Sequence, residues 1–149
     1  MKKILIVLAP YYEDIVTEMY KNALDVLTIH DGKLSNKVKI KYDIINVAGA
    51  FEIPVTISRN IKKYDGFIAL GCIIKGETPH FDFISRAAID GIMKISIESK
   101  KPIGNGIITC LNMKQAMARK KKGSEAAEAV MSVFSQKKWK HNIILIKVR

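Results

Sequence analysis

The chain has 149 residues, 48% of them hydrophobic, and a formal net charge of +11. This length and composition predict one domain, residues 1–149, with a substantial core. They argue against a membrane-spanning helix, because no apolar run approaches the roughly 20 residues that cross a bilayer. The amino-terminal stretch MKKILIVLAPYY lacks the small-residue cleavage site of a signal peptide, so we interpret it as a buried strand and expect a cytoplasmic protein.

The positive charge permits three kinds of partner: nucleic acid, an acidic membrane surface or an anionic small substrate. Much of the charge lies after residue 113, where only Glu125 and Glu128 oppose the lysines and arginines. Aromatic residues do not alternate with the lysine clusters and no nucleic-acid-binding motif is present, so a nucleic-acid-binding protein is the less favoured hypothesis. A solvated basic surface is the simplest interpretation of the excess charge.

The cysteines and histidines do not predict a metal centre. Cys72 and Cys110 are the only cysteines, and each lies in or beside an apolar run, so we expect two reduced core residues. The three histidines are scattered and show no ligand spacing with either cysteine. We therefore predict no metal site.

Four short apolar runs rich in β-branched residues predict strands over Lys3–Ala9, Ile40–Val47, Gly66–Cys72 and Ile103–Cys110. Between and after them, apolar residues recur at helical spacing: Met19, Ala23, Val26 and Leu27, then Ile53, Ile57 and Ile61, then Phe81, Ile84, Ala88, Ile92 and Ile95, then Ala116, Ala126, Ala127, Val130, Val133 and Phe134. Strands that alternate with helices predict an α/β fold with a parallel sheet covered on both faces.

In open parallel sheets, ligands bind beyond the carboxyl ends of the strands. Three segments follow the first three strands: PYYED, AGAFEIP and IIKGETPH. They therefore meet at the edge of the sheet where the carboxyl ends of the strands lie, here called the rim. Tyr11 in the first segment is suited either to stacking on a flat heterocycle or to ordinary half-buried packing. Glu52 in the second is suited either to capping the next helix or to accepting hydrogen bonds from ligand hydroxyls.

The third segment has the sequence of a helix start. Thr78 is a good N-cap and Pro79 a good first helical residue, which places His80 second. The free amides of such a turn bind anions, so a phosphate near Glu77 and Thr78 is the simplest occupant. Lys75 either adds a positive charge to this anion site or is an ordinary surface charge. His80 is suited to proton transfer in carbonyl chemistry, or merely caps or packs.

Two further features of the sequence lie outside the three segments that meet at this rim. We expect Asn105 to precede the fourth strand and to lie at the opposite edge of its own sheet, so that it reaches a site on the rim only in another subunit. The final stretch, KKWKHNIILIKVR, is basic and then β-branched, and it stands apart from the strand–helix alternation. We interpret it as an edge strand, a tail or a partner-docking segment.

Three stretches resemble the lumazine synthase family: GAFEIP at 49–54, ALGCIIKGETPHFDFI at 69–84 and NGIITCLNMKQAMAR at 105–119. The similarity runs from about residue 4 to about residue 134, and residues 135–149 match nothing typical of the family. The resemblance implies a three-layer α/β/α sandwich with a four-stranded parallel sheet, flavodoxin-like in class. It also implies an enzyme of riboflavin biosynthesis that condenses 5-amino-6-(D-ribitylamino)uracil with 3,4-dihydroxy-2-butanone 4-phosphate. Family members use no metal or organic cofactor, and their sites lie between subunits of a pentamer.

The resemblance also implies roles for residues, position by position. His80 matches the proton donor, Tyr11 the aromatic that stacks on the pyrimidine, and Arg119 the phosphate-binding arginine, with Lys122 matching a nearby lysine. The other substrate-binding positions are Ala50, Phe51 and Glu52 around the uracil and ribityl chain, Cys72, Ile73 and Ile74 whose backbone reads the pyrimidine edge, Glu77 and Thr78 in the phosphate turn, and Asn105 from the neighbouring subunit.

The sequence departs from the family pattern at several of these positions. Tyr12 stands in a segment, PYY, where Arg-Phe-Asn is usual, and Asn105 stands where Phe is frequent. The stretch RKKKGSEAA lacks the extra Gly-rich residues of relatives that form 60-subunit capsids, so we predict a pentamer or a decamer. The alternative function within the same fold is a riboflavin synthase of the archaeal type or a flavin-binding relative.

Overall fold

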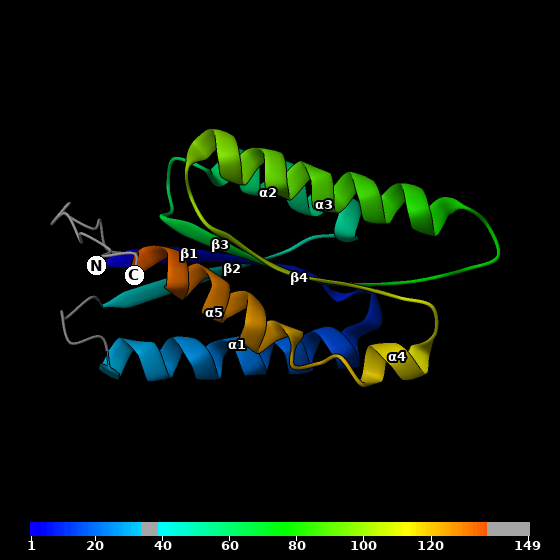
Figure 1. The fold of residues 1–149 in the computed structure, drawn as a ribbon, viewed down its shortest axis with the longest axis horizontal. Helices are drawn as coiled ribbons and strands as arrows, with labels where there is room; N and C mark the ends of the chain where they lie inside the picture. Colours follow the sequence, from blue (N-terminus) through cyan, green and yellow to red (C-terminus); the bar gives the residue numbers. More distant parts are fainter. Residues whose placement is uncertain (34–38, 137–149) are drawn as a thin grey trace, which may run out of the picture.

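Four strands form one parallel sheet in the computed structural model, which describes residues 1–33 and 39–136 (Figure 1). The strands are β1 (Lys2–Ala9), β2 (Ile40–Asn46), β3 (Gly66–Ile74) and β4 (Ile103–Cys110). Their order across the sheet is β2-β1-β3-β4, so β2 and β4 are the edge strands. The four strand predictions are confirmed to within two residues at each end.

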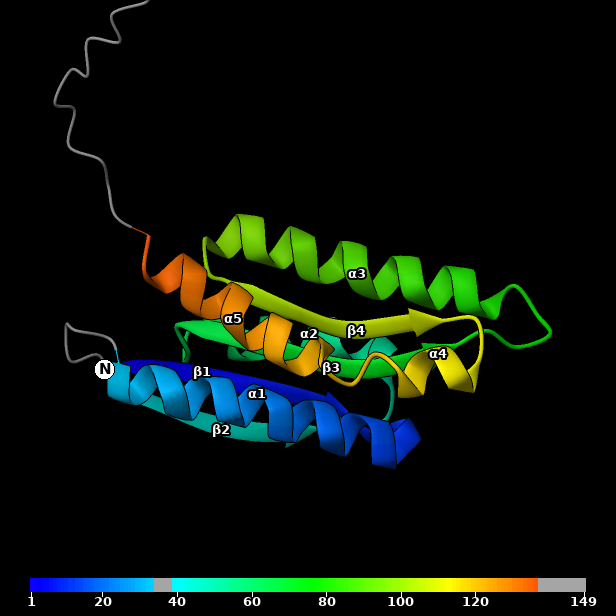
Figure 2. The same cartoon turned by 60° about the horizontal axis from the view of Figure 1, so that its bottom comes forward.

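Helices cover both faces of the sheet. The helix α1 (Glu13–Lys33) packs beside α5 (Lys122–Phe134) on one face, and α2 (Ile53–Asn60) packs beside α3 (His80–Ser99) on the other (Figures 1 and 2). The short helix α4 (Met113–Met117) lies between β4 and α5 in the chain, at the end of the sheet where β4 finishes. The predicted three-layer α/β/α sandwich is therefore confirmed.

Two apolar cores follow from the alternation of side chains along the buried strands. In β1, Ile4 and Ile6 face α1 and α5, whereas Leu5 and Val7 face α2 and α3. Each of these four side chains is fully buried. A continuous apolar run is thus required in a strand that is covered on both faces.

The helix α5 approaches its neighbours closely at two glycines. A side chain on Gly104 of β4 would overlap the carbonyl group of Ala126, and one on Gly123 would overlap the carbonyl group of Met19 in α1. These contacts fix α5 against both the sheet and α1, and they place the turn before α5 beside the free edge of β4. The segment KKWKHNIILIKVR, interpreted above as an edge strand, a tail or a docking segment, is residues 137–149 and lies outside the described residues.

Candidate functional site

Two exposed aromatic rings stand at the carboxyl ends of β1 and β2. Tyr11 belongs to the 3₁₀ turn η1 (Pro10–Tyr12), and Phe51 belongs to η2 (Ala50–Glu52). Tyr11 is 77% exposed and Phe51 58% exposed, although both are large and apolar. The ring of Tyr11 meets that of Tyr12 edge-on, with centroids 5.0 Å apart, while Tyr12 packs against the core under it. The half-buried packing considered for Tyr11 is therefore wrong, and its ring is available for stacking.

Glu52 does not cap the helix that it precedes. It occupies the N-cap position of α2, but its side chain makes no capping hydrogen bond. It lines a cavity of about 600 Å³ together with Asn46 and Val47 at the end of β2. Ala50, just before it, is buried. Of the two interpretations offered for Glu52, capping is thus wrong, and the carboxylate remains free to accept hydrogen bonds from a ligand.

The turn after β3 is open and exposed. Glu77 and Thr78 are exposed, and a side chain on Gly76 would meet nothing within 4 Å. The helix α3 begins at His80, one residue later than predicted, with Pro79 at the N-cap position. Thr78 still satisfies one amide of the first helical turn: its Oγ1 accepts a hydrogen bond from the His80 N–H at 3.4 Å. The imidazole of His80 stands exposed at the mouth of this turn.

The end of β3 offers backbone rather than reactive side chains. Burial, with a smaller contribution from Cys110, raises the pKa of Cys72 to about 12, so the thiol is neutral near pH 7. Ile73 and Ile74 are partly buried, and the Lys75 N–H donates to the Cys110 carbonyl group at 2.9 Å. Both cysteines are free thiols, as the sequence predicts.

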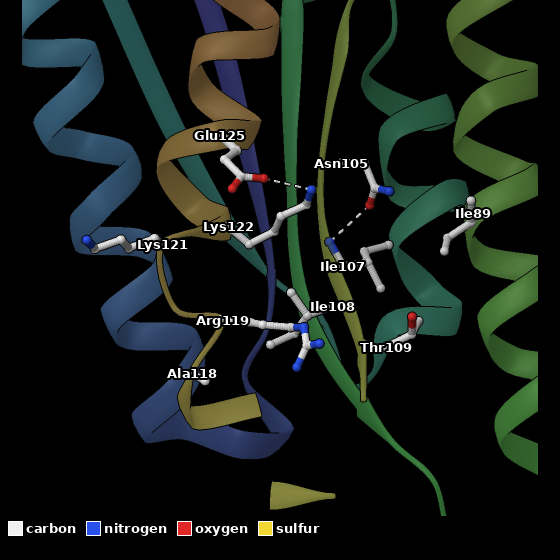
Figure 3. Close-up of a pocket in the computed structure, with 10 residues that line it drawn as sticks. All are labelled: Ile89, Asn105, Ile107, Ile108, Thr109, Ala118, Arg119, Lys121, Lys122 and Glu125. Carbon is white, nitrogen blue, oxygen red and sulfur yellow. Dashed lines mark hydrogen bonds and ion pairs between the residues drawn. The ribbon is translucent and has the colours of Figure 1, made fainter. Parts of the chain in front are cut away.

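A second region of interest lies across the free edge of β4. It is a cavity of about 590 Å³ between β4, α3 and the start of α5 (Figure 3). Its lining includes three cationic side chains and one carboxylate: Arg119, Lys121, Lys122 and Glu125. Asn105, Ile107 and Thr109 line it from β4. The excess of positive charge in this lining favours an anion over a cation.

Internal contacts hold the polar side chains of this β4-edge cavity. Asn105 Oδ1 accepts the Ile107 N–H at 3.0 Å, and Lys122 Nζ lies 2.8 Å from Glu125 Oε2 (Figure 3). Arg119 donates from Nη1 to the Gln115 carbonyl group at 3.1 Å. Burial raises the pKa of Cys110, but the positive charge of Arg119 opposes this shift, so Arg119 lies within electrostatic reach of the end of β4.

The expectation that Asn105 precedes the fourth strand is wrong. Asn105 is inside β4, where it is in register with Ala69 of β3. The strand starts at Ile103, as its predicted range Ile103–Cys110 required, so that range and the expectation for Asn105 disagreed with each other. Asn105 nevertheless lies five residues before Cys110, the last residue of β4, which is about 16 Å along a strand. It is therefore remote from the rim of its own sheet.

The predicted site residues thus fall into two groups. The rim group follows β1, β2 and β3, and consists of Tyr11, Ala50, Phe51, Glu52, Cys72, Ile73, Ile74, Glu77, Thr78 and His80. The β4-edge group consists of Asn105, Arg119 and Lys122, which share one cavity. No member of the rim group lines that cavity in the described part of the chain.

Comparison with known proteins identifies the family of the chain. The family model described as 6,7-dimethyl-8-ribityllumazine synthase matches residues 1–138. The chain belongs to the 6,7-dimethyl-8-ribityllumazine synthase family. It is 40% identical over 144 residues to the protein of that name from Bartonella bacilliformis, covering 91% of this chain and 90% of that protein. It is 37% identical over 147 residues to the one from Agrobacterium fabrum, with 91% and 94% covered. It is 36% identical over 124 residues to the one from Corynebacterium kroppenstedtii, with 78% of each covered.

Sequence reasoning missed three polar residues of the β4-edge cavity, Thr109, Lys121 and Glu125. Lys121 directly precedes the predicted Lys122, and the other two also had a signal. Thr109 follows Asn105 by four positions, so the two share one face of the strand. Glu125 follows Lys122 by three positions, the spacing of an ion pair on a helix.

The described residues hold no group of three or more His, Cys, Asp or Glu side chains close enough to bind a metal ion. Within the same residues, no helix has the length and apolar character needed to cross a membrane.

Proposed function

We propose that the protein is a transferase that condenses 5-amino-6-(D-ribitylamino)uracil with 3,4-dihydroxy-2-butanone 4-phosphate to give 6,7-dimethyl-8-ribityllumazine, phosphate and water. Membership of the 6,7-dimethyl-8-ribityllumazine synthase family supports this reaction, and the relatives compared above carry that name. Nothing favours the riboflavin synthase or flavin-binding alternative. A cytoplasmic location remains a prediction.

The rim group is suited to the pyrimidine. The exposed ring of Tyr11 offers a flat apolar face for stacking. The uncapped carboxylate of Glu52 is an acceptor for hydroxyl groups of the ribityl chain. The backbone of Cys72, Ile73 and Ile74 supplies donors and acceptors for the pyrimidine edge.

The butanone phosphate requires positive charge and free amides. The turn at Glu77 and Thr78 precedes the amino terminus of α3, where backbone N–H groups and the helix dipole favour an anion. Arg119 supplies a fixed guanidinium, and Lys122 a second cation, from the β4-edge cavity. His80, exposed beside the turn, is the candidate for moving protons during imine formation, phosphate loss and ring closure.

The observation that carries this assignment is the separation of the two groups within one chain. The rim group and the β4-edge group belong to one substrate-binding set by family position, yet the residues that line the β4-edge cavity include none from the rim. Two copies in a closed ring bring the rim of one to the β4 edge of the next, which is a heterologous interface. This supports a site shared between subunits of a pentamer, free or paired into a decamer.

The reaction is tested by mixing the purified protein with both substrates and following the absorbance and fluorescence of the lumazine product. Absence of product above the uncatalysed rate would contradict the proposed function. Light scattering tests the assembly: we expect five or ten times the chain mass of 16.7 kDa. A particle near a megadalton would contradict the pentamer, and a monomer would contradict the shared site.

Mixing two variants tests the shared site directly. Arg119→Ala damages the β4 edge and leaves the rim intact, whereas Glu52→Gln damages the rim and leaves the edge intact. In rings assembled from equal amounts of both chains, about a quarter of the interfaces pair an intact rim with an intact edge. We expect a matching recovery of activity over the two unmixed variants. No recovery in mixed rings would place each site within one chain.

A further inference from the structure

The cations of the β4-edge cavity belong to one short turn, residues 119–122, which leads from α4 into α5 and is here called the cationic turn. Arg119, Lys121 and Lys122 line the cavity, and with Lys120 they make four consecutive positive charges. The side chains of Arg119 and Lys122 extend from the turn toward β4 (Figure 3). Among the described residues, only the carboxylate of Glu125 opposes them in the lining. The position of the cationic turn therefore decides where the cavity presents its positive charge.

The charges of the cationic turn do not hold it in place. Neighbouring cations repel one another, and this repulsion favours conformations that spread them apart. Local backbone hydrogen bonds oppose the repulsion only in part. The Lys122 N–H donates to the Arg119 carbonyl group at 3.0 Å, but the Gly123 N–H reaches the Lys120 carbonyl group only at 3.4 Å. A fixed turn of this composition thus depends on contacts with another element.

The helix α1 supplies these contacts from a distant part of the chain. Asn22 Nδ2 donates to the Lys120 carbonyl group at 3.1 Å, in a partly buried hydrogen bond between residues 98 positions apart. Ser124 Oγ donates in return to the Asn22 carbonyl group at 3.4 Å. One turn earlier in α1, the Met19 carbonyl group lies so close to Gly123 that a Cβ there would overlap it. Asn22 thus fastens the middle of the cationic turn where α5 lies directly against α1.

We infer that Asn22 is a positioning residue for binding of the butanone phosphate. The inference rests on the function proposed above, in which Arg119 and Lys122 bind the phosphate group. Asn22 does not line the cavity, so it acts through the carbonyl group of Lys120, which stands between these two cations in the chain. A neutral amide is suited to this role, because it anchors a carbonyl group and adds neither a competing carboxylate nor a further cation.

The benefit of this anchor is that the positive charge is in place before the substrate arrives. A turn that is already held does not have to be ordered during binding, so less of the binding free energy is lost. Arg119 also has a local anchor, since its Nη1 donates to the Gln115 carbonyl group at 3.1 Å. Loss of the Asn22 amide should therefore weaken phosphate binding without abolishing it.

Asn22→Leu tests the inference, because leucine keeps the branched shape of the side chain but cannot donate a hydrogen bond. We expect the Michaelis constant for the butanone phosphate to rise about three- to tenfold, the effect of one lost hydrogen bond. The constant for the pyrimidine and the maximal rate should change by less than about twofold. A merely structural role would lower the rate through loss of folded protein and leave both constants unchanged. Asn22→Ala gives the same comparison if the leucine variant does not fold.

Thr28→Val is the matched control on the same helix. It removes the hydrogen bond from Thr28 Oγ1 to the Leu24 carbonyl group, which is 2.9 Å long and lies within α1. Both Michaelis constants should stay within about twofold of the native values.

A double-mutant cycle tests whether Asn22 acts through the cations. In a chain that carries both Arg119→Ala and Lys122→Ala, Asn22→Leu should no longer change the Michaelis constant for the butanone phosphate. An effect as large as in the native chain would mean that Asn22 acts on something other than these two side chains, and it would overturn the inference.

Binding of inorganic phosphate separates this inference from the proposed function. Titration calorimetry of the assembled protein with inorganic phosphate, without the pyrimidine, measures the anion site whether or not lumazine product forms. We expect binding to be about three- to tenfold weaker in Asn22→Leu than in the native chain. Equal phosphate affinity in the two proteins, or no phosphate binding by the native chain, would overturn the inference. A native protein that binds phosphate but forms no product would contradict the proposed function, while the Asn22 comparison would still decide whether this residue positions the cations.

Discussion

Lys122 Nζ lies 2.8 Å from Glu125 Oε2, so a cation proposed to bind the substrate phosphate already has an anionic partner in the β4-edge cavity. Both side chains are substantially exposed, at 41% and 65%. An exposed pair of this kind is worth only about 0.2–1 kcal/mol. The phosphate competes with Glu125 for Lys122 at a small energetic cost.

Glu125→Gln should tighten binding of the butanone phosphate, because it removes the competing carboxylate and one negative charge from the cavity. The pair energy corresponds to a fall of about 1.4- to fivefold in the Michaelis constant for that substrate. Steady-state kinetics with the pyrimidine at saturation measures it. The control is Glu98→Gln, since Glu98 also pairs with a lysine, Lys94, on an exposed helix face but does not line the cavity. A rise in the constant for Glu125→Gln would mean that the carboxylate positions Lys122 rather than competing with phosphate.

Arg119→Ala should have a larger effect in the opposite direction. A charge-assisted hydrogen bond is worth roughly 1.5–3 kcal/mol, so we expect the Michaelis constant for the butanone phosphate to rise about tenfold or more. The constant for the pyrimidine should move much less. Lys114→Ala, which removes an equal charge on α4 outside the cavity, should leave both constants near the native values. An equal rise for both substrates in Arg119→Ala would indicate a structural role for the arginine.

His80→Ala should slow turnover while leaving substrate binding largely unchanged. General acid–base assistance is worth about 10²- to 10⁴-fold, but the reaction also has an uncatalysed background. We therefore expect a loss in turnover of no more than about 10²-fold, measured as the maximal rate with both substrates saturating. His80 is exposed, so its replacement by alanine should leave the melting temperature unchanged. This measurement is the internal control. Unchanged turnover would remove His80 from the mechanism.

The fold was predictable because its signals are local. The buried runs ILIV in β1 and FIAL in β3 are continuous and apolar, which only a doubly covered strand requires. The helix start near His80 was wrong by one residue, since Thr78 accepts the His80 amide while Pro79 takes the N-cap position. Such boundaries depend on geometry that residue type does not determine.

The roles proposed for the candidate site residues stay predictions, and the sequence did not show how these residues are arranged in space. The expectation that Asn105 precedes the fourth strand was wrong, and it disagreed with the predicted strand range Ile103–Cys110, which contains Asn105 and which the structure confirms. The sequence allowed the Glu52 side chain either to cap α2 or to bind a ligand. The structure excludes the first, because this side chain makes no capping hydrogen bond. That Arg119, Lys122 and Asn105 share one cavity depends on how α5 folds back beside β4, which is a tertiary contact with no local signature.

Lys101→Met should destabilise the fold without touching either group of site residues. Lys101 Nζ donates to the carbonyl groups of Ile61, at 2.6 Å, and Tyr64, at 2.8 Å, and so holds the end of α2 against the loop before β4. Methionine preserves the apolar stem but leaves both partly buried carbonyl groups without this donor. We expect a loss of about 1.5–3 kcal/mol in the free energy of unfolding by urea, at fixed protein concentration. Lys62→Met, at an exposed position nearby, should change stability by less than about 0.5 kcal/mol.

Gly123→Ala should also destabilise the fold, even though alanine favours helices. A Cβ at Gly123 would overlap the backbone carbonyl group of Met19, which belongs to the rigid helix α1 rather than to a flexible side chain. Alanine gains about 1 kcal/mol over glycine inside a helix, but overpacking against a fixed neighbour costs typically 1–3 kcal/mol or more. Since relief requires α5 to move away from α1, we expect the cost to exceed the gain by about 2 kcal/mol, which lowers the melting temperature by roughly 4–8 °C. The control is Gly76→Ala, where the new methyl group would meet nothing within 4 Å. Calorimetry that finds Gly123→Ala as stable as the native protein would mean that α5 shifts freely along α1, and the position of Lys122 in the β4-edge cavity would then not depend on this contact.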